Sequence, residues 1–294
     1  MSDVRDLDDA PAERVATAVV ASRRYRGLDA ELVRRMTAEE LPRAGNEADA
    51  VKRVRRRLHQ AVAAYRSAPR DGSGARDLAR LESAWKGRLG DPAFRDACAT
   101  VLRRHASTRE RLPHLEHYFP RLWELTGEPP QRIADLGCGL GPLALPWMGL
   151  PAGAHYLAVD VDTAQLDLAD RFLALVGQPH RVVAADLAAT DLVPDTLVGE
   201  RVDVAFLLKL VPLLDRRDRA AAGRLLGALD ARDAVVSFPV RSLGGRGKGM
   251  ERTYRERLTG LVAALGDRVN AVTEASIPGE LVFVLRLAER GSRG

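Results

Sequence analysis

Residues suited to holding a nucleoside follow three apolar runs in the second half of the chain. A glycine-rich turn, 135–141 (DLGCGLG), follows the run 132–134, and Asp160 and Asp186 each follow a further run. Glycines allow the backbone to turn tightly and to approach a ligand, whereas carboxylates accept hydrogen bonds from ribose hydroxyls. The spacing therefore predicts a nucleoside-cofactor site, with a simple tight turn as the alternative.

The pattern favours S-adenosylmethionine over a dinucleotide. The turn reads G-x-G-x-G, whereas dinucleotide-binding turns read G-x-G-x-x-G. S-adenosylmethionine has no phosphate, so it does not need a helix N-terminus that faces a pyrophosphate. It needs a close backbone at its methionine moiety, an acid for the ribose and a polar partner for adenine. Gly137, Asp160 and Asp186 would supply these.

A second glycine-rich segment, 242–250, does not match the phosphate-binding loop of an NTPase. That loop reads G-x-x-x-x-G-K-[ST], but here Ser242 replaces the first glycine and Gly249 replaces the hydroxyl residue that would hold magnesium. Because the segment follows the expected strand 234–238, we expect it to lie over the pocket. Its Arg246 and Lys248 could bind a substrate phosphate, and a solvent-exposed loop charged for solubility is the alternative.

Strands and helices alternate after Pro130, and these elements would position the candidate residues. The expected strands are 132–136, 155–159, 181–185, 202–207, 234–238 and 281–287, and the expected helices are 163–176, 216–229 and 252–265. Such alternation predicts an α/β fold with a mostly parallel sheet that is covered on both faces. Ligands in this architecture bind outside the carboxyl ends of the strands, so the turn and both acids converge there.

The N-terminal third has a different, helical pattern and a positive charge. Apolar residues recur at helical spacing in 51–65 and in 78–89, which predicts an all-helical module. Residues 14–104 hold 21 Lys and Arg against 11 Asp and Glu, a formal charge of +10, whereas the whole chain carries +5. This excess predicts a module that contacts a polyanion, and solvated helix faces are the alternative. Further along, 107–110 (STRE) fits a capping box at the start of a helix.

Other bulk features indicate an intracellular protein. The two cysteines are too few for a disulfide framework, which favours the reducing cytoplasm. The polar, acidic start shows no signal peptide, and no apolar run approaches the ~20 residues that a membrane span needs. We therefore expect a cytoplasmic protein without a membrane partner, and we expect a monomer.

Three separated motifs resemble one family of enzymes. They are 236–250 (VSFPVRSLGGRGKGM), 105–112 (HASTRERL) and the glycine turn 138–140 with 142–144 and 146–148. They resemble the aminoglycoside-resistance methyltransferases of 16S ribosomal RNA, which modify N7 of a decoding-site guanine. The similarity extends along most of 105–260. It implies a Rossmann-like, S-adenosylmethionine-dependent methyltransferase domain at 105–294, and an all-helical domain at 1–104 that docks on the 30S subunit.

The resemblance also implies a set of cofactor contacts. By position these are His105, Ala106, Ser107, Arg111 at the methionine carboxylate, Gly137, Asp160, Asp186, Leu187, and either Leu207 or Leu208. Two positions depart from the family pattern. Gly141 stands where the family usually has asparagine, and Arg216 and Arg217 stand where a glutamine near the cofactor is expected.

The implied chemistry needs neither a catalytic base nor a metal. Guanine N7 carries an in-plane lone pair, so it attacks a sulfonium methyl without prior deprotonation. We therefore expect Lys209 to be a structural or RNA-contacting residue. The expected RNA contacts are Arg241, Arg246 and Lys248 near the pocket, and Arg23, Arg24, Arg26, Lys52, Arg53, Arg55, Arg56, Arg57, Lys86 and Arg88 in the helical module. A small-molecule methyltransferase and a non-catalytic ribosome-binding protein remain as alternatives.

Overall fold

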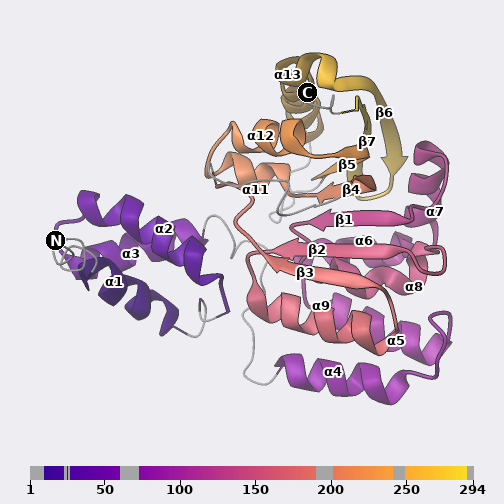
Figure 1. Ribbon diagram of the computed structural model, residues 1–294, viewed down its shortest axis with the longest axis horizontal. Helices are drawn as coiled ribbons and strands as arrows, with labels where there is room; N and C mark the ends of the chain where they lie inside the picture. Colours follow the sequence, from indigo (N-terminus) through magenta and orange to yellow (C-terminus); the bar gives the residue numbers. More distant parts are fainter. Residues whose placement is uncertain are drawn as a thin grey trace.

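A seven-stranded sheet with helices on both faces forms the larger part of the molecule in the computed structural model (Figure 1). The structure describes residues 10–22, 25, 27–59, 73–189, 201–240 and 249–289. The strand order is β3-β2-β1-β4-β5-β7-β6. The parallel strands are β1 (Arg132–Leu136), β2 (His155–Asp160), β3 (His180–Ala184), β4 (Val202–Leu208) and β5 (Ala231–Pro239). These strands and the α/β class confirm the prediction.

The end of the sheet holds one strand that the sequence pattern did not predict. The predicted strand 281–287 is β7 (Glu280–Leu287), which pairs antiparallel with β5. β6 (Val269–Ile277) then pairs antiparallel with β7 at the edge of the sheet. An edge strand with one solvated face lacks the continuous apolar run of a buried parallel strand. Accordingly, Val272 of β6 is 43% exposed.

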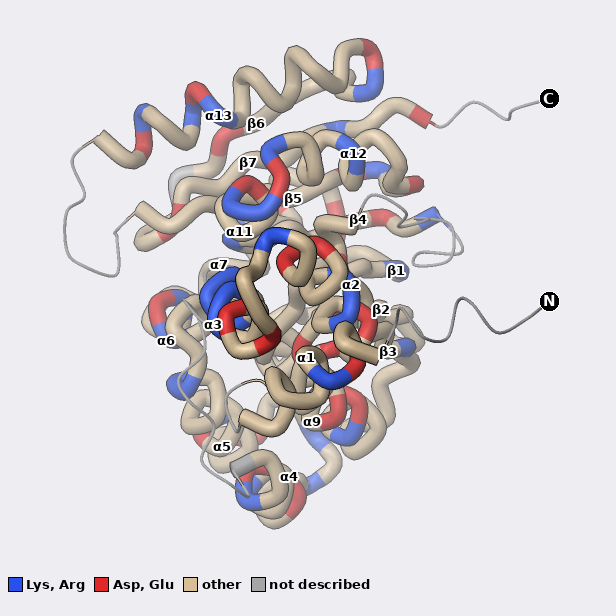
Figure 2. The backbone as a smooth tube through the Cα atoms, turned by 90° about the vertical axis from the view of Figure 1, so that its left-hand side faces the viewer, with Lys and Arg blue, Asp and Glu red and all other residues tan. Residues whose placement is uncertain are grey.

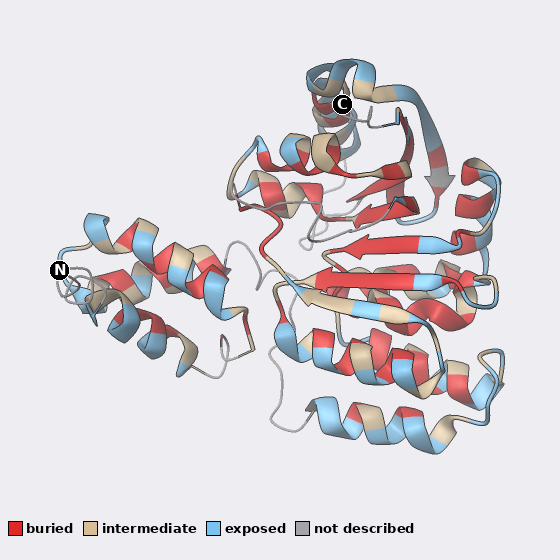
Figure 3. Cartoon of the chain, in the orientation of Figure 1, coloured by how far each residue is buried: buried red, intermediate tan, exposed pale blue. Residues whose placement is uncertain are grey.

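The sheet separates two hydrophobic cores, and alternate residues of its strands point into one core or the other. On one face, Ile133, Tyr156 and Phe206 pack with α7 (Leu115–Thr126) and α9 (Thr163–Leu175). On the other, Leu157 and Leu207 pack with α11 (Val211–Asp215), α12 (Ala221–Ala228) and α13 (Met250–Leu265). Successive strand residues point to opposite faces, so the central strands β1, β4, β5 and β7 supply both cores and are mostly red in Figure 3.

One predicted helix is shorter than expected, and one predicted cap does not form. Within the expected helix 216–229, α12 begins only at Ala221, because the preceding turn includes Asp218, whose carboxylate accepts the Ala220 N–H. The short helix α11 before that turn was not expected. The capping box at 107–110 does not form, because the N-cap of α6 (Ala106–Arg111) is His105, two residues before Ser107. Ser107 is therefore already inside the helix, and its hydroxyl contacts the His105 ring at 2.8 Å.

The basic N-terminal region packs in two separate places. α1 (Ala10–Val20), α2 (Ala30–Glu40) and α3 (Glu47–Leu58) share their own core, and we call these three helices the helical lobe. α4 (Ser73–Ala84) and α5 (Pro92–Leu102) instead join the core beneath the sheet. There the ring of Phe94 stacks on that of Phe172, with centroids 6.0 Å apart. The division between cores thus lies between α3 and α4, whereas the sequence predicted a domain division at residue 104. We call the described residues from α4 onward, 73–289, the sheet domain.

The helical lobe lies beside the carboxyl end of β2 (Figures 1 and 2). The Asp29 N–H donates to the Val161 carbonyl at 2.7 Å, and the Thr163 N–H donates to the Gly27 carbonyl at 2.9 Å. In the part of the chain that the structure describes, no helix is both long and apolar enough to span a membrane.

Candidate cofactor site

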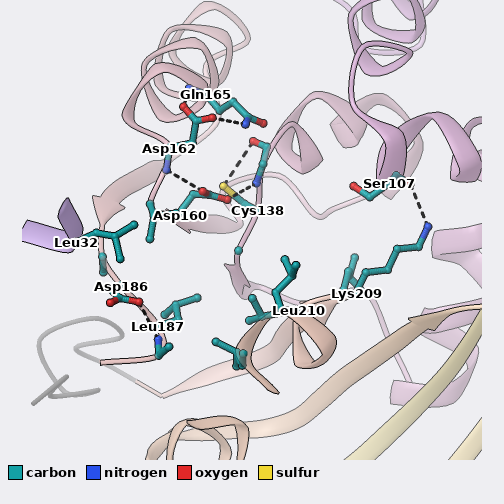
Figure 4. A pocket seen from close by; sticks show the side chains of 18 of the residues that line it. Leu32, Ser107, Cys138, Asp160, Asp162, Gln165, Asp186, Leu187, Lys209 and Leu210 are labelled. Carbon is teal, nitrogen blue, oxygen red and sulfur yellow. Dashed lines mark hydrogen bonds between the residues drawn. The ribbon is translucent and has the colours of Figure 1, made fainter. Parts of the chain in front are cut away.

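A pocket of about 850 Å³, counted with its open mouth, lies at the carboxyl ends of the parallel strands. The segments that follow β1, β2, β3 and β4 all contribute to its lining, as do α2 and α6 (Figure 4). Seven of the predicted cofactor residues line it: His105, Ser107, Gly137, Asp160, Asp186, Leu187 and Leu208. The convergence expected from the positions of the turn and the acids after their strands is therefore present.

The glycine turn is tied to the end of β2. The backbone N–H groups of Gly137 and Cys138 both donate to the Val159 carbonyl, at 2.8 and 3.0 Å. Gly137 has a φ of 72°, and a Cβ there would lie 2.8 Å from Leu210 Cδ1. A side chain at this position would therefore be strained and would also displace the pocket wall.

Asp160 accepts two backbone hydrogen bonds at the pocket. The Gly139 N–H donates to Oδ2 at 2.8 Å and the Asp162 N–H donates to Oδ1 at 2.9 Å. Burial, and then the nearby carboxylate of Asp162, raise the pKa of Asp160 to about 6. The two N–H groups fix the carboxylate plane. Each carboxylate oxygen can accept more than one hydrogen bond, so both retain capacity for ligand hydroxyls.

Asp186 lies between two arginines. Its Oδ1 accepts the Ala188 N–H at 3.1 Å and an N–H of Arg217, whereas its Oδ2 lies 3.8 Å from the Arg35 guanidinium. Oδ2 is buried and has no hydrogen-bond partner among the described residues. An acceptor left open beside the apolar side chain of Leu187 suits the amino group of adenine. This donor and acceptor set fits S-adenosylmethionine, with Asp160 for the ribose and Asp186 for the base.

A buried charge network forms the opposite end of the pocket. Lys209 has a left-handed φ of 58°, is 2% exposed, and lies 2.6 Å from Glu110 and 3.3 Å from Glu280. Arg111 donates two hydrogen bonds to Glu280, at 2.9 and 3.0 Å, and Tyr118 donates a third at 3.1 Å. Burial opposes the ionisation of Glu280, but Arg111 and Lys209 outweigh it and hold the pKa of Glu280 below its usual range.

Three predicted contacts do not line the pocket. Arg111 is buried against Glu280, and Ala106 is buried in α6. Leu207 belongs to the core around α11 and α12, whereas its neighbour Leu208 lines the pocket. The alternation of β4 explains this difference, because adjacent residues point to opposite faces of the sheet.

The pocket also contains residues that the sequence did not assign to it. Leu32 comes from α2 of the helical lobe, and no local pattern could indicate its place. Gln165 enters from the first turn of α9, the helix that follows β2. Arg217 occupies the region where a glutamine was expected, and its contact with Asp186 shows that an arginine also reaches the site. Lys209, expected to be structural or to contact RNA, lines the pocket as well.

The predicted RNA-contacting residues fall into three groups. Arg23, Arg24, Arg26, Arg241, Arg246 and Lys248 lie outside the described residues. Lys52, Arg56, Lys86 and Arg88 are exposed. Arg53 and Arg57 bind Glu40 at 2.8 and 2.9 Å, and Arg55 donates to the Ala18 carbonyl at 2.7 Å. These last three arginines therefore link the helices of the lobe. No cluster of acidic, histidine or cysteine side chains within the described ranges could hold a metal ion.

The comparisons with known proteins agree with this geometry. A family model described as ribosomal RNA methyltransferase (FmrO) matches residues 21–284. The chain belongs to this family. A 16S rRNA (guanine(1405)-N(7))-methyltransferase of Frankia casuarinae is 40% identical over 276 residues, which cover 93% of each protein. A protein of the same description from Micromonospora echinospora is 34% identical over 275 residues, covering 93% of this chain and 96% of that protein.

Solved structures extend the family relationship to the fold. The crystal structure of the 16S rRNA methyltransferase RmtF in complex with S-adenosyl-L-homocysteine has a TM-score of 0.79 and 31% identity, covering 95% of this chain and 99% of that one. The 16S rRNA methylase RmtB has a TM-score of 0.74 and 26% identity, covering 94% and 98%. The family resemblance that three motifs indicated is thus confirmed, and it extends over nearly the full length of the chain.

Proposed function

We propose that this chain transfers the methyl group of S-adenosylmethionine to N7 of a guanine in the 16S rRNA of the 30S subunit. The observation that carries the proposal is the convergence of Gly137, Asp160 and Asp186 on one pocket in a chain of this family. Relatives described as 16S rRNA (guanine(1405)-N(7))-methyltransferases cover 93% of the chain, and the related RmtF binds S-adenosyl-L-homocysteine.

The residues of the chain act by holding and orienting the reactants. S-adenosylmethionine supplies a sulfonium methyl group, and guanine N7 has a free lone pair, so alignment replaces acid–base catalysis. Asp160 and Asp186 would hold the nucleoside, with Gly137 at the methionine end. Lys209 is paired with Glu110 and Glu280, so we assign it no proton-transfer role. Access to N7 in A-form RNA requires local distortion or base flipping, at a cost of roughly a few kcal/mol.

The exposed cations would provide docking affinity for the ribosomal subunit. Phosphate contacts position a protein without reading sequence, so the folded 30S surface is the expected substrate. On the helical lobe, Lys52 and Arg56 are exposed on α3, whereas Arg53, Arg55 and Arg57 have partners within the lobe. We therefore assign docking first to Lys52 and Arg56, and place the enzyme, as a monomer, in the cytoplasm where 30S subunits lie.

Aminoglycoside resistance follows from the product. Methylation of N7 removes a hydrogen-bond acceptor and adds a positive charge, which repels a cationic drug at the decoding site. Expression of the chain in a susceptible bacterium should raise the inhibitory concentration of aminoglycosides that bind there. The Asp160→Ala variant serves as the inactive control.

A labelling experiment tests the proposal directly. Purified 30S subunits are incubated with the protein and methyl-labelled S-adenosylmethionine, and the modified base is mapped. We expect label at N7 of one decoding-site guanine and none on naked 16S rRNA. Label on adenine would contradict the assigned target. Absence of label, with 30S binding retained, would favour a non-catalytic ribosome-binding protein, and transfer only to small molecules would favour the other alternative.

A further inference from the structure

One wall of the cofactor pocket comes from the helical lobe. Leu32 of α2 is fully buried and lines the pocket on the side of Asp160 and Asp186, away from Lys209 and Ser107 (Figure 4). The same side chain belongs to the core that joins α1, α2 and α3. Leu32 therefore contacts both the interior of the lobe and the space available to a ligand.

Backbone contacts hold α2 at this place. The Asp29 N–H donates to the Val161 carbonyl at 2.7 Å, next to Asp160 in the chain. The Asp29 carboxylate also caps α2 by accepting the Leu32 N–H at 2.9 Å. A Cβ on Gly27 would lie 3.0 Å from the Cβ of Ala164, so the turn before α2 packs closely on the start of α9. The position of Leu32 is thus set relative to Asp160 by neighbouring backbone contacts.

A charged residue on the same helix faces the second acid of the pocket. The Arg35 guanidinium lies 3.8 Å from Asp186 Oδ2, on the other side of the carboxylate from Arg217. Arg35 is half-buried, whereas the adjacent Arg34 is exposed and pairs with Glu31. Asp186 is therefore held between a cation of the helical lobe and a cation of the sheet domain.

We propose that the helical lobe completes the cofactor site, with Leu32 packing against the nucleoside end of S-adenosylmethionine and Arg35 positioning Asp186. The identity of the ligand rests on the function proposed above. The role of the two residues rests on their own geometry. Leu32 makes direct contact, whereas Arg35 acts through Asp186 as a positioning residue.

Calorimetry with two probes tests the role of Leu32. The probes are S-adenosyl-L-homocysteine and 5′-methylthioadenosine, which share the nucleoside end but differ in the amino-acid end. Leu32→Ala should weaken both by a similar factor, about tenfold, because the lost contact is apolar and lies at the shared end. The volume-conserving Leu32→Met should restore most of the affinity. Equal affinity in Leu32→Ala and wild type, or a loss restricted to S-adenosyl-L-homocysteine, would overturn the assignment.

A matched control separates pocket contact from lobe stability. Leu58 is fully buried in the same core but does not line the pocket. Leu58→Ala removes the same atoms, so it should lower the melting temperature as Leu32→Ala does while leaving the affinity for both probes within about twofold. An equal loss of affinity in both variants would show that only lobe stability matters, and would contradict the proposal.

The role of Arg35 can be tested without disturbing the core of the helical lobe, because Arg35 is not part of that core. Arg35→Ala should weaken both probes by about three- to tenfold through a less well-placed Asp186, and Arg35→Lys should recover part of the loss. Arg34→Ala, one residue away, should leave affinity unchanged. Equal affinity in Arg35→Ala and Arg34→Ala would overturn the role of Arg35. These measurements use no ribosomes, so a failure to methylate 30S subunits would contradict the proposed function and leave the result on Leu32 and Arg35 standing.

Discussion

Asp160 combines burial with a fixed set of donors, and both properties matter for ligand binding. Two backbone N–H groups hold its carboxylate, at 2.8 and 2.9 Å. Asp160→Ala should reduce the affinity for S-adenosyl-L-homocysteine by about 100-fold or more. The variant loses the hydrogen bonds from the two ribose hydroxyls to the carboxylate, and a hydrogen bond to a charged group contributes about 1.5–3 kcal/mol. Asp167→Ala, at an exposed position on α9 that pairs with Arg171, is the control. Unchanged calorimetric affinity in Asp160→Ala would contradict the assignment of the site.

The raised pKa of Asp160 predicts a pH dependence of binding. Without ligand its pKa is about 6, because burial disfavours the charged form. Ribose hydroxyls bind the ionised form, so affinity should be full above pH 7 and should fall up to tenfold per pH unit below about 6. The stability of the unliganded protein has the opposite dependence. The contribution of this raised pKa is fully present below the ordinary value of 3.8, and is lost as pH rises through about 6.

Calorimetry from pH 5 to 8 measures this dependence, and Asp160→Asn provides the comparison. Asp135 also has a pKa raised to about 6 by burial, and it accepts a hydrogen bond from Tyr156. Asp135 remains in the Asp160→Asn variant, so its contribution to any pH effect is retained there. A pH profile of the same steepness in Asp160→Asn and wild type would exclude Asp160 as the titrating group.

At the scale of elements, Glu280 joins three regions of the chain that are distant in the sequence. It stands at the start of β7 and contacts Arg111 of α6, Tyr118 of α7 and Lys209 after β4. Glu280→Ala would leave two buried cations without this carboxylate, so it should lower the free energy of unfolding by about 3–5 kcal/mol. Glu274→Ala, on the exposed face of β6, removes a pair with Arg255 and should cost below about 1 kcal/mol. Urea denaturation of the two variants gives the comparison, and equal losses would contradict the account.

The assignment of α5 to the core of the sheet domain is testable through Phe94. This ring is fully buried between Trp85 and Phe172. Phe94→Ala should therefore lower the free energy of unfolding of the sheet domain by about 3–5 kcal/mol. Val272→Ala, at the exposed edge, should change it by below about 0.5 kcal/mol. Limited proteolysis shows which part of the chain is destabilised. Faster cleavage of the helical lobe alone in Phe94→Ala would contradict the packing of α5 against the sheet domain.

At the scale of the whole molecule, the charge of the helical lobe is only partly available to an external polyanion. Lys52 and Arg56 are exposed on α3, while Arg53 and Arg57 pair with Glu40. Reversal of Lys52 and Arg56 to glutamate should weaken 30S binding and reduce its salt dependence by roughly two units of log K against log salt. Affinity for S-adenosyl-L-homocysteine should not change.

The control for that experiment reverses two exposed arginines of the sheet domain, Arg121 and Arg171. Both double variants change the net charge by the same amount, but the control places the change outside the helical lobe. In the control, 30S affinity should therefore fall less, and the slope of log K against log salt should match that of the wild type. Equal weakening by the two pairs would show that net charge alone governs binding, and the helical lobe would lose its assigned role in docking.

The two proposed roles of the helical lobe have a joint consequence. The lobe holds the exposed cations of α3 and also supplies Leu32 to the pocket. Any movement of α2 upon docking would therefore alter cofactor affinity, and linkage requires that the cofactor alter 30S affinity by the same factor.

Local patterns were sufficient to predict the parallel strands of the sheet and the convergence of the glycine turn and two acids on one pocket. The five parallel strands, the glycine turn and the two acids depend on the periodicity of apolar residues and on turn residues, which are properties of short segments. The rule that parallel strands end at one edge then brings Gly137, Asp160 and Asp186 together. The family resemblance depends on motifs of the same local kind.

Tertiary structure decided the contacts between distant segments. Arg111 was expected at a ligand carboxylate, but it binds Glu280, which lies 169 residues further along the chain. Leu32 reaches the pocket because α2 docks beside β2, and β6 forms because β7 offers an unpaired edge. In each case the interaction partner is not a neighbour in the local sequence pattern. Glu280 neutralises the charge of Arg111, the pocket wall covers the apolar side chain of Leu32, and β7 provides the backbone hydrogen bonds of β6. Burial and pairing therefore determined these contacts, and local propensity could not reveal them.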